Sequence, residues 1–244
     1  MTVLKIPIIG IKGSKGSGKD TVASMIHYIL AVGTTIANLD GWKRYNMLEK
    51  DELDVPTLHF ADALKEQLSM MFHIERSNFD NPEYKDCMYY SFDSKGFINN
   101  TVKDSCKLPE ITIEDLQTNT LVKWRESYYD KCVIKLRTLM QYYGTEIIRN
   151  QLGENIWIDI CIRKAIAYSK YYGYSVIADV RFNNESAAIR EFRGQIIKVV
   201  RNKSENEHAS ENISEDNRDY VIENNGTLMG LFFKVLQFVK DEMV

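Results

Sequence analysis

The amino-acid sequence predicts an α/β fold, in which a parallel β-sheet is flanked by helices and an inserted helical or lid region interrupts the chain. Two observations predict this fold. Short β-branched runs alternate with amphipathic helical patterns at both ends of the chain, and such alternation gives a parallel sheet with right-handed crossovers. A glycine-rich loop lies between the first strand and the first helix. We therefore expect one domain of residues 1–244, with the insertion at about residues 75–130.

The individual elements follow from the spacing of apolar residues. Val22, Met25, Ile26 and Ile29 fall on one face of the first helix, whereas residues 75–121 carry turn signals without a clear period. A strand that is apolar throughout and ends abruptly in polar residues, as residues 174–182 do, is typical of the centre of a parallel sheet. We expect strands at residues 3–11, 56–61, 174–182, 195–201 and 219–224, and helices at residues 19–32, 62–73, 113–129, 133–152, 155–173, 185–194 and 227–243.

Composition excludes several classes of protein. Hydrophobic residues make up 44% and charged residues 27% of the chain, as in ordinary globular proteins. A formal net charge of -3 argues against nucleic acid as a partner. No apolar run is long enough to span a membrane and the N-terminus lacks a signal-peptide pattern, so we expect a soluble, cytoplasmic protein without a membrane partner. The four cysteines have no C-x-x-C spacing, which favours free thiols over zinc or disulfides.

The glycine-rich loop has the spacing of a phosphate-binding P-loop, G-x-x-x-x-G-K. In such a loop, backbone N–H groups and the N-terminus of the next helix converge on phosphates, and the lysine holds the β- and γ-phosphates of a nucleotide. The preceding strand and the following helix supply the context that this motif requires. The candidate cofactor-binding residues are therefore Gly13, Ser14, Lys15, Gly16, Ser17, Gly18, Lys19, Asp20 and Thr21.

The residue after the lysine departs from the general motif, which has Ser or Thr to hold Mg²⁺. Here it is Asp20, followed by Thr21. A carboxylate suits a hard cation such as Mg²⁺ as well as a hydroxyl does. Two alternatives stay open: Thr21 or a water held by Asp20 completes the magnesium shell, or the loop binds phosphate without the usual metal ligand.

A second candidate site lies at the end of the strand over residues 174–182. Asp179 and Arg181 are two residues apart and so point to the same side of an extended chain. They form either a simple salt bridge or, beside a P-loop strand, a metal-binding or acceptor-orienting carboxylate and a cation that neutralises the transferring phosphoryl group. Asn184 and Glu185 follow, and helix capping is the favoured role for Asn184.

Polar residues interrupt the apolar pattern of the helix expected at residues 133–152. Gly144 is unfavourable in mid-helix by about 1 kcal/mol relative to Ala and so indicates a close approach or a break. Trp157 is either a core residue or a platform on which a base stacks, and its spacing favours the core. His208 lies in a very polar stretch, where a surface imidazole is the simplest interpretation, and Arg201 could reach a phosphate if that stretch folds over the site.

Taken together, several motifs resemble the deoxynucleoside monophosphate kinases of large tailed bacteriophages and their viral relatives. They are the loop with its Lys-Asp-Thr end, "LMQYYGTEIIR" with a tryptophan shortly after, "DVRFNNE", "VVR" followed by "HASE", and "VIENNGTL". The match runs in order across both ends of the chain but leaves residues 75–121 unmatched. It implies the P-loop kinase fold and transfer of the γ-phosphoryl group of ATP, with Mg²⁺, to a deoxynucleoside monophosphate.

The resemblance also implies roles for individual residues. Lys19, Asp179, Arg181 and Glu185 would act at the transfer point, with Asp20, Thr21 and Asp179 as metal ligands. Asn224 is similar to a residue near the adenine in related kinases. The remaining set would bind the acceptor or close over the phosphates: Lys65, Arg137, Gln141, Glu146, Arg149, Trp157, Arg201, His208 and Glu211.

Two alternatives remain open from the sequence. Another small-molecule P-loop kinase, of the phosphomevalonate kinase or dephospho-coenzyme A kinase type, shares parts of the same motifs. A nucleotide-binding protein without turnover is the more distant alternative. A homodimer is expected only as the commonest soluble assembly.

Overall fold

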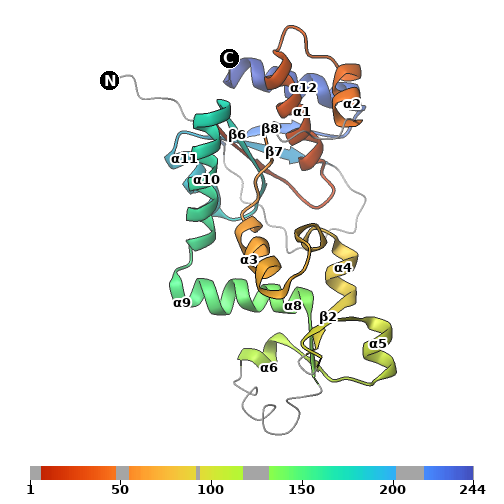
Figure 1. Ribbon diagram of the computed structural model, residues 1–244. Helices are drawn as coiled ribbons and strands as arrows, with labels where there is room; N and C mark the ends of the chain where they lie inside the picture. The colour runs from red at the N-terminus through yellow and green to blue at the C-terminus, as the bar shows by residue number, and fades with distance from the viewer. Residues whose placement is uncertain (1–6, 48–54, 92–93, 118–131, 202–216, 244) are drawn as a thin grey trace. The chain divides into compact units, whose positions relative to one another are not determined.

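The computed structural model describes residues 7–47, 55–91, 94–117, 132–201 and 217–243 (Figure 1). Two compact units make up the chain. Unit 1 combines Met1–Phe60 with Ile158–Val244, and unit 2 is the intervening segment Ala61–Trp157. Unit 2 thus begins before and ends after the insertion expected at about residues 75–130.

Unit 1 is built on a four-stranded sheet whose neighbouring strands are all parallel. Leu58 extends the sheet beyond one edge through a parallel bridge to Ile177, which accounts for the extended piece expected there. The predicted parallel sheet is confirmed. Its strand order is β6 (Ser175–Val180), β1 (Ile8–Lys12), β7 (Gln195–Val200) and β8 (Tyr220–Glu223).

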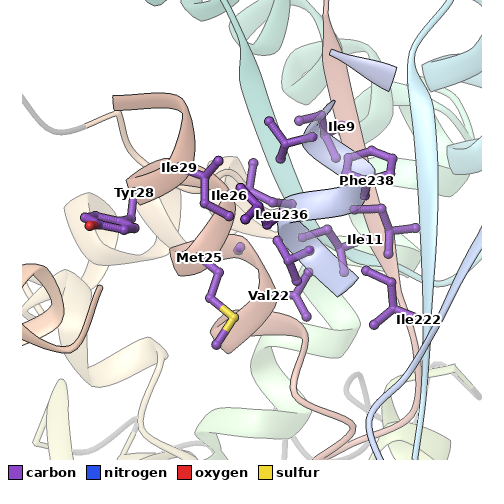
Figure 2. Packing of buried hydrophobic residues seen from close by; sticks show 14 of the residues in the cluster. Ile9, Ile11, Val22, Met25, Ile26, Tyr28, Ile29, Ile222, Leu236 and Phe238 are labelled. Carbon is purple, nitrogen blue, oxygen red and sulfur yellow. The ribbon is translucent and has the colours of Figure 1, made fainter. Parts of the chain in front are cut away.

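Helices cover both faces of this sheet, since successive side chains of a strand point to opposite faces and the central strand β1 is buried throughout. Ile9 and Ile11 of β1 pack with α1 and α12, as Figure 2 shows, while Ile8 belongs to the cluster formed with α10 and α11. The helices are α1 (Lys19–Val32), α2 (Leu39–Met47), α10 (Ile156–Tyr172), α11 (Asn183–Glu191) and α12 (Leu228–Glu242).

Unit 2 contains short helices and a second, mixed sheet with the order β3-β2-β5-β4. β2 runs antiparallel to both β3 and β5, and β4 runs parallel to β5. Its elements are α3 (Asp62–Phe72), the 3₁₀-helix η1 (Arg76–Phe79), α4 (Pro82–Cys87), β2 (Met88–Ser91), β3 (Gly96–Asn99), α5 (Asn100–Ser105), β4 (Glu110–Ile111), α6 (Ile113–Gln117), β5 (Val133–Lys135), α8 (Leu136–Gln141), the π-helix η2 (Tyr142–Arg149) and α9 (Asn150–Leu152).

Two expectations for unit 2 need correction. The helix expected at residues 133–152 begins as a strand, because Val133 and Ile134 are buried and pair with β2 and β4. The insertion at about residues 75–130, expected to be helical, also contains β-strands, which are too short to show a period in the sequence. Of the helix expected at residues 113–129, α6 covers the first part and residues 118–129 lie outside the described residues.

The described part of the chain also settles two simpler points. All four cysteines are free thiols, of which Cys132 and Cys161 are buried. None of the described helices is both long and apolar enough to cross a membrane.

Candidate active site

The glycine-rich loop joins β1 to α1 and is packed so tightly that it requires glycine. A Cβ atom on Gly13 would lie 2.5 Å from the backbone oxygen of Val199 and 2.6 Å from Ser17 Oγ. Gly18 adopts φ 101°, a left-handed conformation that side chains disfavour, and its own Cβ would lie 2.6 Å from Asn224 Nδ2. The glycine spacing read from the sequence is therefore a requirement of the folded loop.

Lys19 is the first residue of α1 and lies against this loop. Its Nζ donates hydrogen bonds to the backbone oxygens of Gly13 at 2.6 Å and Ser14 at 2.8 Å. The positive end of the α1 helix dipole lies at the same place. Loop, ammonium group and helix N-terminus together form an arrangement that favours binding of phosphate groups.

The candidate metal ligands lie at or beyond the C-terminal ends of the neighbouring strands β6 and β1. Asp20 and Thr21 are in the first turn of α1, with Asp20 exposed. Asp179 lies near the end of β6, the neighbour of β1, and its Oδ1 accepts a hydrogen bond from the backbone N–H of Phe60 at 3.0 Å. Carboxylate and hydroxyl oxygens are hard donors and fit Mg²⁺.

Within the described ranges, no group of three or more His, Cys, Asp or Glu side chains could hold a metal ion by itself. Mg²⁺ is usually bound by one or two carboxylates together with substrate phosphates and waters, and Asp20, Thr21 and Asp179 offer donors of that kind. The donor set is consistent with a magnesium ion that arrives with a nucleotide.

The junction between β6 and α11 is held by Glu185. This carboxylate is buried, and its Oε2 accepts hydrogen bonds from the backbone N–H groups of Arg181 at 2.7 Å and Phe182 at 2.9 Å. Asn184 Oδ1 accepts from the N–H of Glu185, so both residues satisfy donors at the start of the helix. Arg181 itself is exposed, and Glu185 fixes the backbone that carries it.

Asn224 lies at the phosphate loop, where its Nδ2 donates to the backbone oxygen of Ser17 at 2.8 Å. Arg201 is exposed, one residue beyond β7. The expected site residues His208 and Glu211 lie outside the described residues.

In unit 2, two of the cations expected to bind the acceptor, Arg137 and Lys65, are each held by a carboxylate. Arg137 makes a bidentate pair with Asp86, at 2.6 and 2.8 Å, and this pairing raises the pKa of Arg137 and lowers that of Asp86. Lys65 Nζ lies 2.6 Å from Asp80 Oδ1. These contacts fix both cations in place while their remaining N–H groups stay available as donors.

The other expected acceptor residues lie on α8 and on the π-helix that follows it. Gln141 is exposed, and Glu146 Oε2 accepts from Asn150 Nδ2 at 2.8 Å. Arg149 ends the π-helix and is partly buried. π-Helical segments occur frequently at functional sites, and no feature of the sequence indicated one here.

Trp157 and Gly144 contact one another. The indole Nε1 of Trp157 donates to the backbone oxygen of Gly144 at 3.0 Å, and the side chain is buried as its spacing predicted. A Cβ on Gly144 would lie 2.9 Å from Leu64 Cδ2, which confirms the close approach inferred from this glycine.

Sequence reasoning missed Lys85 on α4. Burial lowers its pKa, and the neighbouring positive charges of Lys65 and Arg137 lower it further. Lys85 is thus a partly buried cation beside Lys65 and Arg137, two of the cations expected to bind the acceptor. It lies in the stretch without a recognisable period, so only the fold brings it to the others.

A glycine loop between a buried strand and a helix, in a parallel sheet flanked by helices, is consistent with the P-loop kinase fold. The family model described as "Deoxynucleotide monophosphate kinase" matches residues 7–235, and the chain belongs to this family. Its activity is therefore ATP-dependent phosphoryl transfer to a deoxynucleotide monophosphate. A comparison with curated proteins found no match.

Proposed function

We propose that the phosphate loop of unit 1 binds ATP together with Mg²⁺, and that Lys19 is its principal phosphate ligand. The single observation that carries this proposal is the position of Lys19. Its ammonium group lies within hydrogen-bonding distance of two loop carbonyls at the N-terminus of α1, where the loop N–H groups and the helix dipole favour phosphate. When ATP binds, Lys19 exchanges these carbonyls for oxygens of the β- and γ-phosphates.

Magnesium would be held by Asp179 and by Thr21 or Asp20, and when bound it neutralises charge on the phosphates. Asp179 is suited to this role because its second oxygen is oriented by the hydrogen bond that Phe60 donates to the first. Arg181 adds a positive charge that is exposed one residue beyond β6. Glu185 acts as a positioning residue, since its carboxylate holds the backbone of Arg181.

The acceptor monophosphate is proposed to bind to the cations of unit 2. Lys65 and Arg137 are held in place by Asp80 and Asp86, and Lys85 lies beside both. A phosphate dianion would relieve the repulsion among these cations. Gln141, Glu146 and Arg149 on α8 and the π-helix are proposed to contact the nucleoside.

In the reaction, an oxygen of the acceptor monophosphate attacks the γ-phosphorus of ATP. The bond from the γ-phosphorus to the β–γ bridging oxygen breaks, and the products are ADP and a deoxynucleoside diphosphate. The protein forms no covalent bond in this scheme, because positioning of the substrates and positive charge lower the activation barrier of the transfer. Lys19 and Arg181 supply that charge in our proposal.

The experiment is an ADP-release assay with ATP and Mg²⁺ against a panel of deoxynucleoside and ribonucleoside monophosphates, phosphomevalonate and dephospho-coenzyme A. We expect turnover with one or more deoxynucleoside monophosphates. Lys19→Met should lower kcat/KM by about a hundredfold or more, because it removes a charge that stabilises the transition state. Lys43→Met, on the surface of α2, serves as the matched control and should have no effect.

Turnover by Lys19→Met at the wild-type rate would contradict the proposed role of the loop. Turnover confined to phosphomevalonate or dephospho-coenzyme A would contradict the proposed acceptor.

The expected setting of the protein is also a proposal. Both substrates are small nucleotides of the cytoplasm, and the net charge of -3 gives no support for a nucleic-acid partner. We propose that the protein works in the cytoplasm, of the host if it is viral, without a nucleic-acid or membrane partner. A homodimer remains a prediction from the frequency of such assemblies.

A further inference from the structure

The residues that flank the edge strand β8 contact the phosphate loop and the residue that precedes it, although β7 separates β8 from β1. Asp219, directly before β8, pairs with Lys12, which is the last residue of β1 and directly precedes Gly13. Asn224, directly after β8, donates to the backbone oxygen of Ser17 inside the loop. The residues that flank β8 thus hold both the residue before the loop and a residue within it.

The tie at the beginning of the loop is a buried ion pair. The side chains of Lys12 and Asp219 are 3% and 0% exposed, and Arg190 of α11 contacts the other oxygen of Asp219. Breaking a buried pair leaves an uncompensated charge, which is strongly unfavourable. The end of β1 is therefore held in register with β8 and α11.

The tie at the other end acts on a single peptide group. Asn224 Nδ2 donates to Ser17 O at 2.8 Å, and the backbone N–H of Asn224 donates to Val200 O at 2.7 Å, which fixes the residue to β7. In a trans peptide the C=O and N–H bonds point in opposite directions. Holding the Ser17 carbonyl therefore also fixes the direction of the Gly18 N–H group, one of the loop donors.

Glycine at position 18 is part of this arrangement. A Cβ there would lie 2.6 Å from Asn224 Nδ2, so the amide occupies the space that a side chain would fill. Asn224 and the loop are thus in direct contact, although Asn224 and Ser17 lie 207 positions apart in the sequence.

We propose that Asn224 is a positioning residue for the phosphate loop, acting through the Ser17 carbonyl, and that the Lys12–Asp219 pair anchors the other end of the same loop. The inference rests on the proposed function, since it assumes that the loop binds the phosphates of ATP. It differs from a role at the adenine because its effect does not depend on the base.

The test compares ATP with tripolyphosphate, which has no base, each with Mg²⁺, by isothermal titration calorimetry. Asn224→Ala should weaken binding of both probes by the same factor, roughly three- to tenfold, as expected for loss of one hydrogen bond. Asn224→Asp, which keeps the size but replaces the donor with an acceptor, should weaken both further. Gln237→Ala, at an exposed position of α12, is the control and should bind both probes as the wild type does.

Two results would contradict the inference but leave the proposed function intact. In the first, the Asn224 variants bind both probes as tightly as the wild type. In the second, they bind ATP more weakly but tripolyphosphate as the wild type does, which indicates a contact with adenine. If the wild-type protein binds neither probe, the proposed function fails and the inference fails with it. Circular dichroism of each variant distinguishes a positioned loop from an unfolded protein. The KM for the deoxynucleoside monophosphate should stay unchanged in every folded variant, because Asn224 contacts the loop that is proposed to bind ATP.

Discussion

At the scale of single residues, several acidic and basic side chains lie close together around α4 of unit 2, where the acceptor phosphate is proposed to bind. Asp80 is shared by Lys65 and Arg76, and Asp86 contacts Arg137 at 2.6 Å and Lys135 at 3.9 Å. Lys85 lies beside these groups, and burial together with its positive neighbours lowers its pKa. A cation in such surroundings is stabilised by an anionic ligand.

Replacing this lysine tests the acceptor site directly. Lys85→Met keeps the length of the side chain and removes its charge, so we expect the KM for the deoxynucleoside monophosphate to rise roughly three- to tenfold with little change in kcat, since ground-state and transition-state binding are weakened alike. Steady-state kinetics with each substrate varied in turn provides the measurement. Lys170→Met, at an exposed position of α10, is the control.

A rise confined to the KM for ATP would place Lys85 at the donor and contradict its assignment to the acceptor. An unchanged KM for both substrates would exclude it from binding altogether.

At the scale of elements, close packing between α11, β7 and β1 depends on Gly194. A Cβ at this position would lie 2.6 Å from the backbone oxygen of Ile8 and 2.9 Å from that of Ile189. Backbone atoms of a sheet and a helix cannot move aside as a flexible side chain can. The turn from α11 into β7 therefore accepts only glycine without displacement of an element.

Gly194→Ala should lower the free energy of unfolding by about 1–3 kcal/mol, the usual cost of overpacking. Gly226→Ala is a matched control, because nothing lies within 4 Å of its Cβ position, and it should change stability by less than about 0.5 kcal/mol. Urea denaturation of both variants measures the difference. Equal stability of the two would show that the sheet and helix adjust more easily than their packing indicates.

The π-helix η2 is an element that reflects tertiary contacts more than local preference. Gly144 within it approaches Leu64 of α3 and accepts a hydrogen bond from Trp157. From the apolar spacing we expected an α-helix over these residues, with a close approach or a break at Gly144. Contacts of Gly144 with Leu64 and Trp157 accompany the wider turn, which ends at Arg149.

At the scale of the whole molecule, each unit has its own buried core. The clusters around Ile9 and around Ile8 belong to unit 1, whereas those around Phe79 and around Ile134 belong to unit 2. The proposed ATP ligands lie in the first unit and most of the proposed acceptor ligands in the second. The two substrates should therefore protect different parts of the chain.

Hydrogen–deuterium exchange can detect this division. A non-hydrolysable ATP analogue with Mg²⁺ should slow amide exchange mainly in the phosphate loop and around Asn224, whereas a deoxynucleoside monophosphate alone should slow it mainly in α3, α4 and α8. The reason is that a ligand lowers the frequency of local opening in the elements that bind it. Protection of the phosphate loop by the monophosphate alone would contradict the assignment of the two sites.

Much of the fold could be predicted because its signals are local. The glycine spacing, the apolar strands and the amphipathic helices of unit 1 are patterns within short windows, and the parallel sheet agrees with them. The same holds for Lys19, whose place at the start of α1 follows from the motif. The sheet of unit 2 could not be predicted, because its strands have two to four residues and some of them pair with segments distant in the sequence.

By itself, the sequence determined the phosphate loop, the alternation of strands and helices around it, and the resemblance to deoxynucleoside monophosphate kinases that the family match confirms. Only the tertiary structure decided that Val133 and Ile134 lie in a strand, that Lys85 joins Lys65 and Arg137, and that Asn224 holds the Ser17 carbonyl. The physical reason is the range of the interactions. A loop or a helix face is fixed by neighbours a few residues apart, but the contact between Asn224 and Ser17 joins residues 207 positions apart, and such a contact exists only when the sheet has formed.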